Sequence, residues 1–93
     1  MQAKHVKGKK AADIMLYTLS TCIWCKKTKE FLKELGVEYF YIDVDTVSGE
    51  EKEKVSEEIE KWNPAVSFPT IVIDNKESVL GFQPDEIKEK LKI

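Results

Sequence analysis

The 93-residue sequence contains no arginine: all 15 basic residues are lysine, and with 17 acidic residues the formal net charge is −2. Arginine reads guanine and phosphate through paired hydrogen bonds, so its absence from a slightly acidic chain argues against sequence-specific nucleic-acid binding. No apolar run approaches the roughly 20 residues that a membrane-spanning helix needs. We therefore expect neither a nucleic-acid partner nor a membrane partner.

Cysteine is also scarce, because two residues are too few for a secreted scaffold held by disulfide bonds. A basic N-terminal segment precedes an apolar stretch at 14–19, but Asp13 interrupts the approach and no small-residue cleavage pattern follows. We expect a cytoplasmic protein rather than a secreted one. Residues 1–12 are interpreted as a flexible basic tail, and residues 13–93 as one domain.

After the tail, the hydrophobic pattern switches between strand and helix. Residues 14–18 form a nearly continuous apolar run, typical of a strand that is buried on both faces. Apolar residues recur at helical spacing over residues 23–35, and Gly36 follows where a helix ends. Residues 37–43 are rich in aromatic and β-branched side chains, which predicts a second strand. This strand–helix–strand unit is expected to be right-handed.

The second half of the chain predicts a helix, a hairpin and a last helix. Ser48 and Glu51 have the spacing of a capping box at the start of an amphipathic helix. Residues 70–73 and 77–80 are short apolar strands, close enough for an antiparallel hairpin. Pro84 begins the final helix. The expected order is β-α-β-α-β-β-α, an α/β fold.

Cys22 and Cys25 lie three positions apart, where the first expected strand gives way to a helix. Unpaired N–H groups and the dipole at a helix N-terminus favour the thiolate form of a cysteine, so Cys22 is the predicted nucleophile. Cys25 lies one helical turn further on, where it can attack a mixed disulfide made by Cys22. We expect Trp24 at the surface beside the thiols, and Lys26 and Lys27 as nearby positive charges.

Other chemistry is open to a cysteine pair of this spacing. A structural zinc site needs four ligands, and outside the pair His5 is the one softer candidate, so a protein-only zinc site is not expected. A [2Fe–2S] cluster bridged between two chains by Cys22 and an external thiol stays open. A pair of inert buried thiols is a further alternative. The expected dithiol chemistry needs no organic cofactor and no metal.

A second motif, Ser67-Phe68-Pro69-Thr70, places proline directly before a strand. A cis Phe68–Pro69 bond would expose the backbone of Phe68 beside the thiols, where a peptide-like substrate can pair as an added strand. A trans proline that merely begins the strand is the alternative, and the spacing does not separate the two.

Together, these motifs resemble the thioredoxin superfamily and, within it, the glutaredoxin-like redoxins. The resemblance covers nearly the whole chain after the tail. The matching segments are Leu16-Tyr17-Thr18, Cys22-Ile23-Trp24-Cys25, Tyr41-Ile42-Asp43-Val44-Asp45, Phe68-Pro69-Thr70-Ile71-Val72-Ile73 and Gly81-Phe82-Gln83-Pro84-Asp85. The resemblance implies a thioredoxin-like fold with a four-stranded mixed sheet flanked by three helices, a cis bond at Pro69, and dithiol–disulfide exchange by Cys22 and Cys25. The substrate contacts that it implies are Trp24, Phe68, Pro69, Thr70, Gly81 and Phe82.

Departures from the glutaredoxin pattern narrow the expected partners. Leu19 replaces a lysine that pairs with a glutathione carboxylate, and Gly81-Phe82 replaces a Gly-Gly pair, so we do not expect glutathione as the reductant. The Gly81-Phe82 turn is similar to NrdH-type redoxins, which are reduced by a flavin-containing, thioredoxin-reductase-like enzyme or a ferredoxin-linked reductase and supply electrons to ribonucleotide reductase. Ile23 replaces the usual proline of the dithiol motif, which we expect to make the dithiol more reducing.

The resemblance therefore implies a small monomeric oxidoreductase that reduces protein disulfides, with ribonucleotide reductase as one candidate substrate. The alternative function is an iron–sulfur carrier that holds a [2Fe–2S] cluster between two chains.

Overall fold

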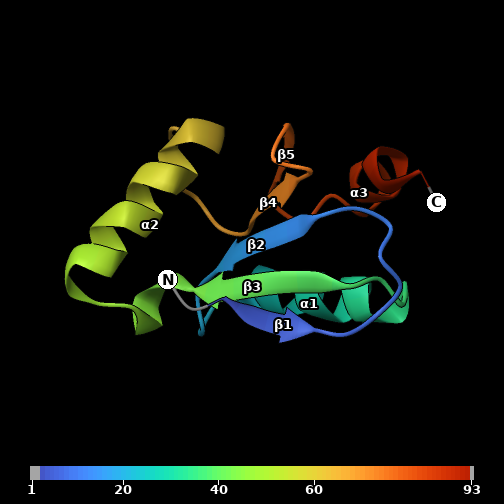
Figure 1. Cartoon of the computed structure of the whole chain (residues 1–93), viewed down its shortest axis with the longest axis horizontal. Coiled ribbons are helices and arrows are strands. Elements are labelled where there is room, and N and C mark those ends of the chain that lie inside the picture. The colour runs from blue at the N-terminus through green and yellow to red at the C-terminus, as the bar shows by residue number, and fades with distance from the viewer. Residues whose placement is uncertain (1–2, 93) are drawn as a thin grey trace.

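The computed structural model describes residues 3–92, which form a mixed β-sheet packed between helices (Figure 1). Met1 and Gln2 of the expected tail and Ile93 of the expected domain lie outside the described residues. The strands are β1 (Lys4–Val6), β2 (Ile14–Thr18), β3 (Tyr39–Asp43), β4 (Thr70–Ile73) and β5 (Glu77–Leu80). The helices are α1 (Ile23–Glu34), the short 3-10 helix η1 (Val44–Thr46), α2 (Gly49–Trp62) and α3 (Pro84–Leu91). From β2 onward, the predicted order of strands and α-helices is confirmed.

The sheet has the strand order β1-β3-β2-β4-β5. β2 and β3 are parallel and are connected through α1, whereas β1, β4 and β5 each run antiparallel to their neighbours. The register places Thr18 beside Asp43 at the carboxyl ends of the two parallel strands. Ligand and catalytic sites of α/β sheets gather outside the carboxyl ends of the strands. In this chain the carboxyl end of β2 leads into α1.

The sheet has five strands, so the prediction of four was wrong. Lys4–Val6 pairs antiparallel with β3, and the ring of His5 stacks on Phe40 with 4.7 Å between centroids. This edge strand is three residues long and mostly exposed, so it carries no apolar pattern that separates it from a lysine-rich tail. The proposed division of the chain between residues 12 and 13 stays a prediction.

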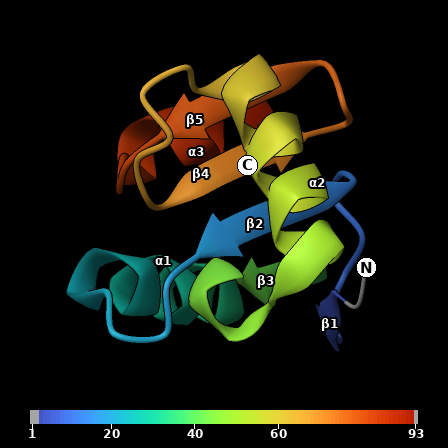
Figure 2. The same cartoon turned by 90° about the vertical axis from the view of Figure 1, so that its left-hand side faces the viewer.

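Two hydrophobic clusters hold the helices to opposite faces of the sheet. α1 and α3 pack on one face, and α2 covers the other; Figure 2 shows α2 crossing in front of β2, with α3 behind β4 and β5. The buried side chains under α1 and α3 are Ile14, Leu16, Leu32, Val37, Tyr39, Ile71, Ile73, Val79, Ile87 and Leu91. Those under α2 are Tyr17, Ile42, Val44, Val55, Ile59 and Val72. Within residues 3–92, no helix has both the length and the apolar character needed to cross a membrane.

The ends of the helices follow the sequence signals with one exception. Gly36 follows α1 with a φ of +71°, a conformation that glycine adopts without strain. Ser48 is the N-cap of α2, as the capping box predicts, but its hydroxyl makes no capping hydrogen bond. The first turn of α2 instead carries Glu50 and Glu51, whose negative charges favour a helix N-terminus.

Candidate active site

Cys22 caps the N-terminus of α1. Its backbone is extended, with φ −84° and ψ 118°, and its N–H donates to the Leu19 carbonyl at 3.2 Å. The Cys22 Sγ accepts a hydrogen bond from the Cys25 backbone N–H at 3.2 Å. The first turn of α1 contains no acidic side chain that would oppose a negative charge. The Cys22 sulfur therefore lies at the positive end of the α1 dipole with a backbone N–H directed at it, the position that a nucleophilic thiol occupies at a helix N-terminus.

Cys25 is completely buried, whereas Cys22 is partly exposed, and both are free thiols. Burial, with a hydrogen bond to Cys22 as the next cause, raises the pKa of Cys25 from 9.0 to about 12. At neutral pH, Cys25 therefore carries its proton. An incoming disulfide meets Cys22 first, with a protonated Cys25 directly behind it.

An aromatic pocket opens beside the dithiol. It has a volume of about 240 Å³ and is lined by Trp24, Phe68, Pro69, Gly81 and Phe82. Trp24 keeps 53% of its surface exposed and stacks on Phe82, with 6.1 Å between ring centroids. The structure thus brings together five of the six side chains and backbone segments that sequence analysis expected to contact substrate.

Three further exposed residues neighbour Trp24 in sequence, one apolar and two basic. Ile23 is 65% exposed, and the exposed Lys27 holds its Nζ 4.7 Å from the centroid of the Trp24 ring. Lys26 is exposed as well. The exposed residues at the start of α1 are therefore two apolar side chains, Ile23 and Trp24, and two lysines.

Thr70 is the exception among the six expected contacts. Its side chain is fully buried, donates to the Ser67 carbonyl at 2.7 Å and accepts from the Asn63 amide at 3.1 Å. These bonds hold the loop that carries Phe68 and Pro69, whose peptide bond is cis as the resemblance implies. Thr70 therefore supports the pocket from inside and does not line it.

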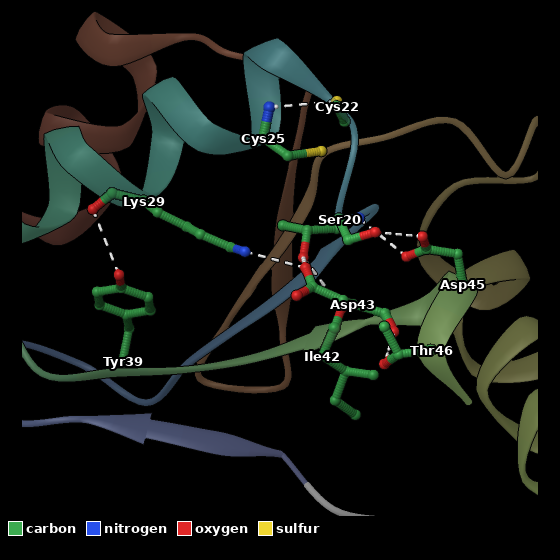
Figure 3. A network of polar contacts seen from close by, with 10 residues as sticks. Ser20, Cys22, Cys25, Lys29, Tyr39, Ile42, Asp43, Asp45 and Thr46 are labelled. Carbon is green, nitrogen blue, oxygen red and sulfur yellow. Dashed lines mark hydrogen bonds and ion pairs between the residues drawn. The ribbon is translucent and has the colours of Figure 1, made fainter.

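A charged cluster lies on the sheet side of α1, near Cys25 (Figure 3). The Lys29 ammonium is 2.9 Å from a carboxylate oxygen of Asp43, and the same oxygen accepts a hydrogen bond from the Thr18 hydroxyl. Thr18 is fully buried, and the side chains of Lys29 and Asp43 are 24% and 15% exposed. Sequence analysis missed this cluster, although Lys29 follows Cys25 by four residues and so shares its helix face.

A second carboxylate fixes the loop in front of Cys22. Asp45 accepts hydrogen bonds from both the backbone N–H and the hydroxyl of Ser20 (Figure 3). The side-chain hydrogen bond from Ser20 is the main cause that lowers the pKa of Asp45 below 3.8. Asp43 and Asp45 both belong to the segment that carries the redoxin resemblance, which is the signal that could have marked them.

No three His, Cys, Asp or Glu side chains cluster within residues 3–92 in a way that could hold a metal ion. His5, the candidate ligand outside the cysteine pair, lies on β1 with its Nε2 3.4 Å from a Glu38 carboxylate oxygen.

The sequence matches the family model described as Glutaredoxin over residues 14–78. The chain belongs to the glutaredoxin family. Two solved structures are especially similar to this glutaredoxin-family chain. The glutaredoxin of Methanosarcina mazei Go1 is 43% identical, with coverage of 100% of this chain and 90% of that chain and a TM-score of 0.93. Methanoredoxin of Methanosarcina acetivorans is 41% identical, with coverage of 99% and 97% and the same TM-score of 0.93.

A more distant relative is the NrdH-redoxin from Escherichia coli, a glutaredoxin-like protein with a thioredoxin-like activity profile. It is 26% identical, with coverage of 83% of this chain and 92% of that chain and a TM-score of 0.67. These similarities confirm the predicted thioredoxin-like fold. Glutaredoxins are in general oxidoreductases, and this family member has their pair of cysteines at the start of α1.

Proposed function

We propose that this chain is a dithiol–disulfide oxidoreductase that reduces protein disulfides, with Cys22 as the nucleophile and Cys25 as the resolving thiol. The observation that carries the proposal is the direction of the Cys25 N–H, which points at the partly exposed Cys22 sulfur while the Cys25 thiol is buried behind it. An inert pair of core cysteines would have no reason to lie at a helix N-terminus with one sulfur reachable from solvent.

The reaction has two exchanges. In the first, the Cys22 thiolate attacks one sulfur of the substrate disulfide, forms a mixed disulfide and releases the other substrate sulfur as a thiolate that takes up a proton. In the second, the Cys25 sulfur gives up its proton and attacks Cys22, so that the Cys22–Cys25 disulfide forms and the second substrate thiol leaves. The substrate gains two electrons, and an external reductant must return two electrons to the chain.

The proposed substrate contacts follow from the pocket. Trp24, Phe68 and Phe82 offer apolar ring surface beside Cys22, which suits the side chains that flank a disulfide in a protein. Lys26 and Lys27, which are exposed at the start of α1, are available to polar groups of such a partner.

The proposed reductant is a flavin-containing, thioredoxin-reductase-like enzyme or a ferredoxin-linked reductase, rather than glutathione. Leu19, at the position of the glutathione-binding lysine, packs against the apolar cluster under α2. The five residues that line the pocket are uncharged, so they offer no partner to a glutathione carboxylate. The thioredoxin-like activity profile of the E. coli NrdH-redoxin supports the same assignment. Ribonucleotide reductase is a candidate substrate on this resemblance.

We further propose that the chain works as a cytoplasmic monomer without a resident cofactor. The alternative, an iron–sulfur carrier, would need Cys22 from each of two chains and an external thiol for each iron. Visible absorbance and a dimer in anaerobically purified protein would favour the carrier, whereas a colourless active monomer would favour the reductase.

Insulin reduction tests the proposal with two supplies of electrons. We expect turnover with NADPH and thioredoxin reductase, or with a ferredoxin-linked reductase, and little turnover with glutathione and its reductase. Cys22→Ser should abolish turnover, whereas Thr21→Ser, a conservative change at the neighbouring exposed position, should keep it. Full activity in Cys22→Ser would contradict the proposed function, and efficient turnover with glutathione would contradict the proposed reductant.

A further inference from the structure

The second exchange requires the buried Cys25 thiol to lose its proton, which the first exchange does not. Cys25 has no exposed surface, so no solvent shell stabilises its sulfur when the proton leaves. Burial is the largest cause that raises the pKa of Cys25, and it persists after Cys22 has formed a mixed disulfide. Cys22 also raises the pKa of Cys25, through a hydrogen bond and through its charge. Both effects end once the Cys22 sulfur is bonded to substrate. Two features then favour its thiolate: a hydrogen bond with the backbone of Leu19, which is the larger effect, and a positive charge near Cys25.

Lys29 supplies such a charge. It follows Cys25 by one helical turn, and Figure 3 shows both side chains projecting from α1 toward the same side, with Asp43 across from them. Its charge acts on Cys25 in the direction that lowers the pKa of the thiol. Its ammonium also lies 4.2 Å from the centroid of the Tyr41 ring, whose negative face attracts a cation.

The position of Lys29 is fixed from two strands. Asp43 on β3 holds the ammonium at 2.9 Å, and Thr18 on β2 donates to the same carboxylate. Thr18 and Asp43 are register partners at the carboxyl ends of these parallel strands, so the sheet itself sets their spacing. A largely buried ion pair contributes little to stability compared with apolar residues of similar volume. Stability alone is therefore a weak reason for charges at this place.

We propose that Lys29 is a positioning residue for the second exchange, which favours the thiolate of Cys25 when Cys25 attacks the mixed disulfide, and that Asp43 and Thr18 hold Lys29 in place. This inference rests on the proposed function. The groups that face Cys25 are Cys22 and Lys29 from α1 and the backbone of Leu19 from the preceding loop, with Asp43 and Thr18 acting through Lys29. The proton that Cys25 loses goes to solvent, where it balances the one taken up by the departing thiolate.

Single-turnover kinetics with a disulfide peptide separate the two exchanges. Reduced protein is mixed with peptide and quenched with acid, and intact mass gives the amounts of mixed disulfide and of oxidised protein over time. We expect Lys29→Met to form the mixed disulfide at the wild-type rate and to resolve it about tenfold more slowly, the size of effect that one partly buried charge produces. The pH at which resolution is half-maximal should move upward. Lys29→Arg, which keeps the charge, should resolve at close to the wild-type rate.

Lys33→Met is the matched control, because Lys33 lies one turn further along α1 and is exposed. It should change neither exchange. Lys29→Gln gives a second neutral variant that stays polar, and urea unfolding confirms that each variant is folded before its kinetics are interpreted. The role of Lys29 would be overturned if a folded Lys29→Met or Lys29→Gln variant resolved the mixed disulfide at the wild-type rate, with the half-maximal pH unchanged. Absence of any mixed disulfide in the wild type would instead overturn the proposed function.

Discussion

Two buried threonines on neighbouring strands, Thr18 and Thr70, each anchor a polar cluster, and the two clusters differ in charge. The Thr18 cluster contains the Lys29–Asp43 ion pair, on the face of α1 that carries Cys25. The Thr70 cluster is neutral: the side chains of Asn63 and Thr70 bond to each other and to Ser67 in the loop before β4.

The charged cluster acts on the chemistry of the site, whereas the neutral cluster acts on its shape. The neutral cluster satisfies buried polar groups in a loop that would otherwise leave them unpaired, so its contribution is to stability and to the place of Phe68 and Pro69. The charged cluster gains little stability from its ion pair but imposes a field on the neighbouring thiol. Variants of the two clusters should therefore differ in their effect on the second exchange.

Asn63→Ala should give the largest loss of stability. The buried Asn63 amide nitrogen lies within 3.1 Å of three acceptors, the Ser67 carbonyl, the Ser67 hydroxyl and the Thr70 hydroxyl, which share its two N–H donors, so its removal leaves buried groups unpaired. We expect the free energy of unfolding, measured in urea, to fall by about 2–3 kcal/mol. Gln83→Ala, which removes an exposed amide, is the control and should change it by less than about 0.5 kcal/mol. Wild-type stability in Asn63→Ala would remove the distinction between the clusters.

The raised pKa of Cys25 predicts a loss of stability in alkali. In the unfolded chain this thiol ionises near its ordinary value of 9.0, but in the folded chain it stays protonated until about pH 12. The stabilisation is therefore complete below pH 9 and is lost as the pH rises from 9 toward 12. Urea unfolding of the reduced protein should show the gap between wild type and Cys25→Ala narrowing over this range. Tyr17, whose pKa burial raises to about 12, is present in both proteins and cancels. A gap that stays constant from pH 7 to pH 11 would contradict the assignment.

Asp45→Asn should have the smallest effect on stability. Hydrogen bonds from Ser20 lower the pKa of Asp45, so the stabilisation from this contact is present above pH 3.8 and is lost as the pH falls below that value. The thermal midpoint of Asp45→Asn should depend less on pH than that of the wild type between pH 5 and pH 2.5. Glu57→Gln, on the exposed side of α2, controls for the removal of one negative charge. An Asp45→Asn profile parallel to the wild type would show that the Ser20 contact adds nothing to stability.

Local signals predicted those features that depend on neighbouring residues. The apolar run of β2, the helical spacing of α1 and the glycine after it placed Cys22 at a helix N-terminus, and the structure has it there. Five of the six residues that the redoxin resemblance implies as substrate contacts line one pocket.

The charged cluster needed information that no local pattern carries. The contact between Thr18 and Asp43 depends on the register of two parallel strands, which pairs residues 25 positions apart in sequence. β1 was missed for a related reason, because three exposed residues become a strand through pairing with β3 and not through their own periodicity. Threonine is a residue type that fits a binding contact. Thr70 is buried because the loop that begins at Asn63 packs over it, and this packing is not visible in the local sequence.

The division of labour between Cys22 and Cys25 is the central claim, and trapping of the mixed disulfide tests it most directly. Cys25→Ser and Cys22→Ser are each incubated in reduced form with a disulfide peptide, and adducts are located by intact mass and peptide mapping. We predict a stable adduct on Cys22 in Cys25→Ser, and little adduct in Cys22→Ser because the remaining Cys25 is buried and protonated. Equal adduct formation in the two variants, or an adduct confined to Cys25, would contradict the account.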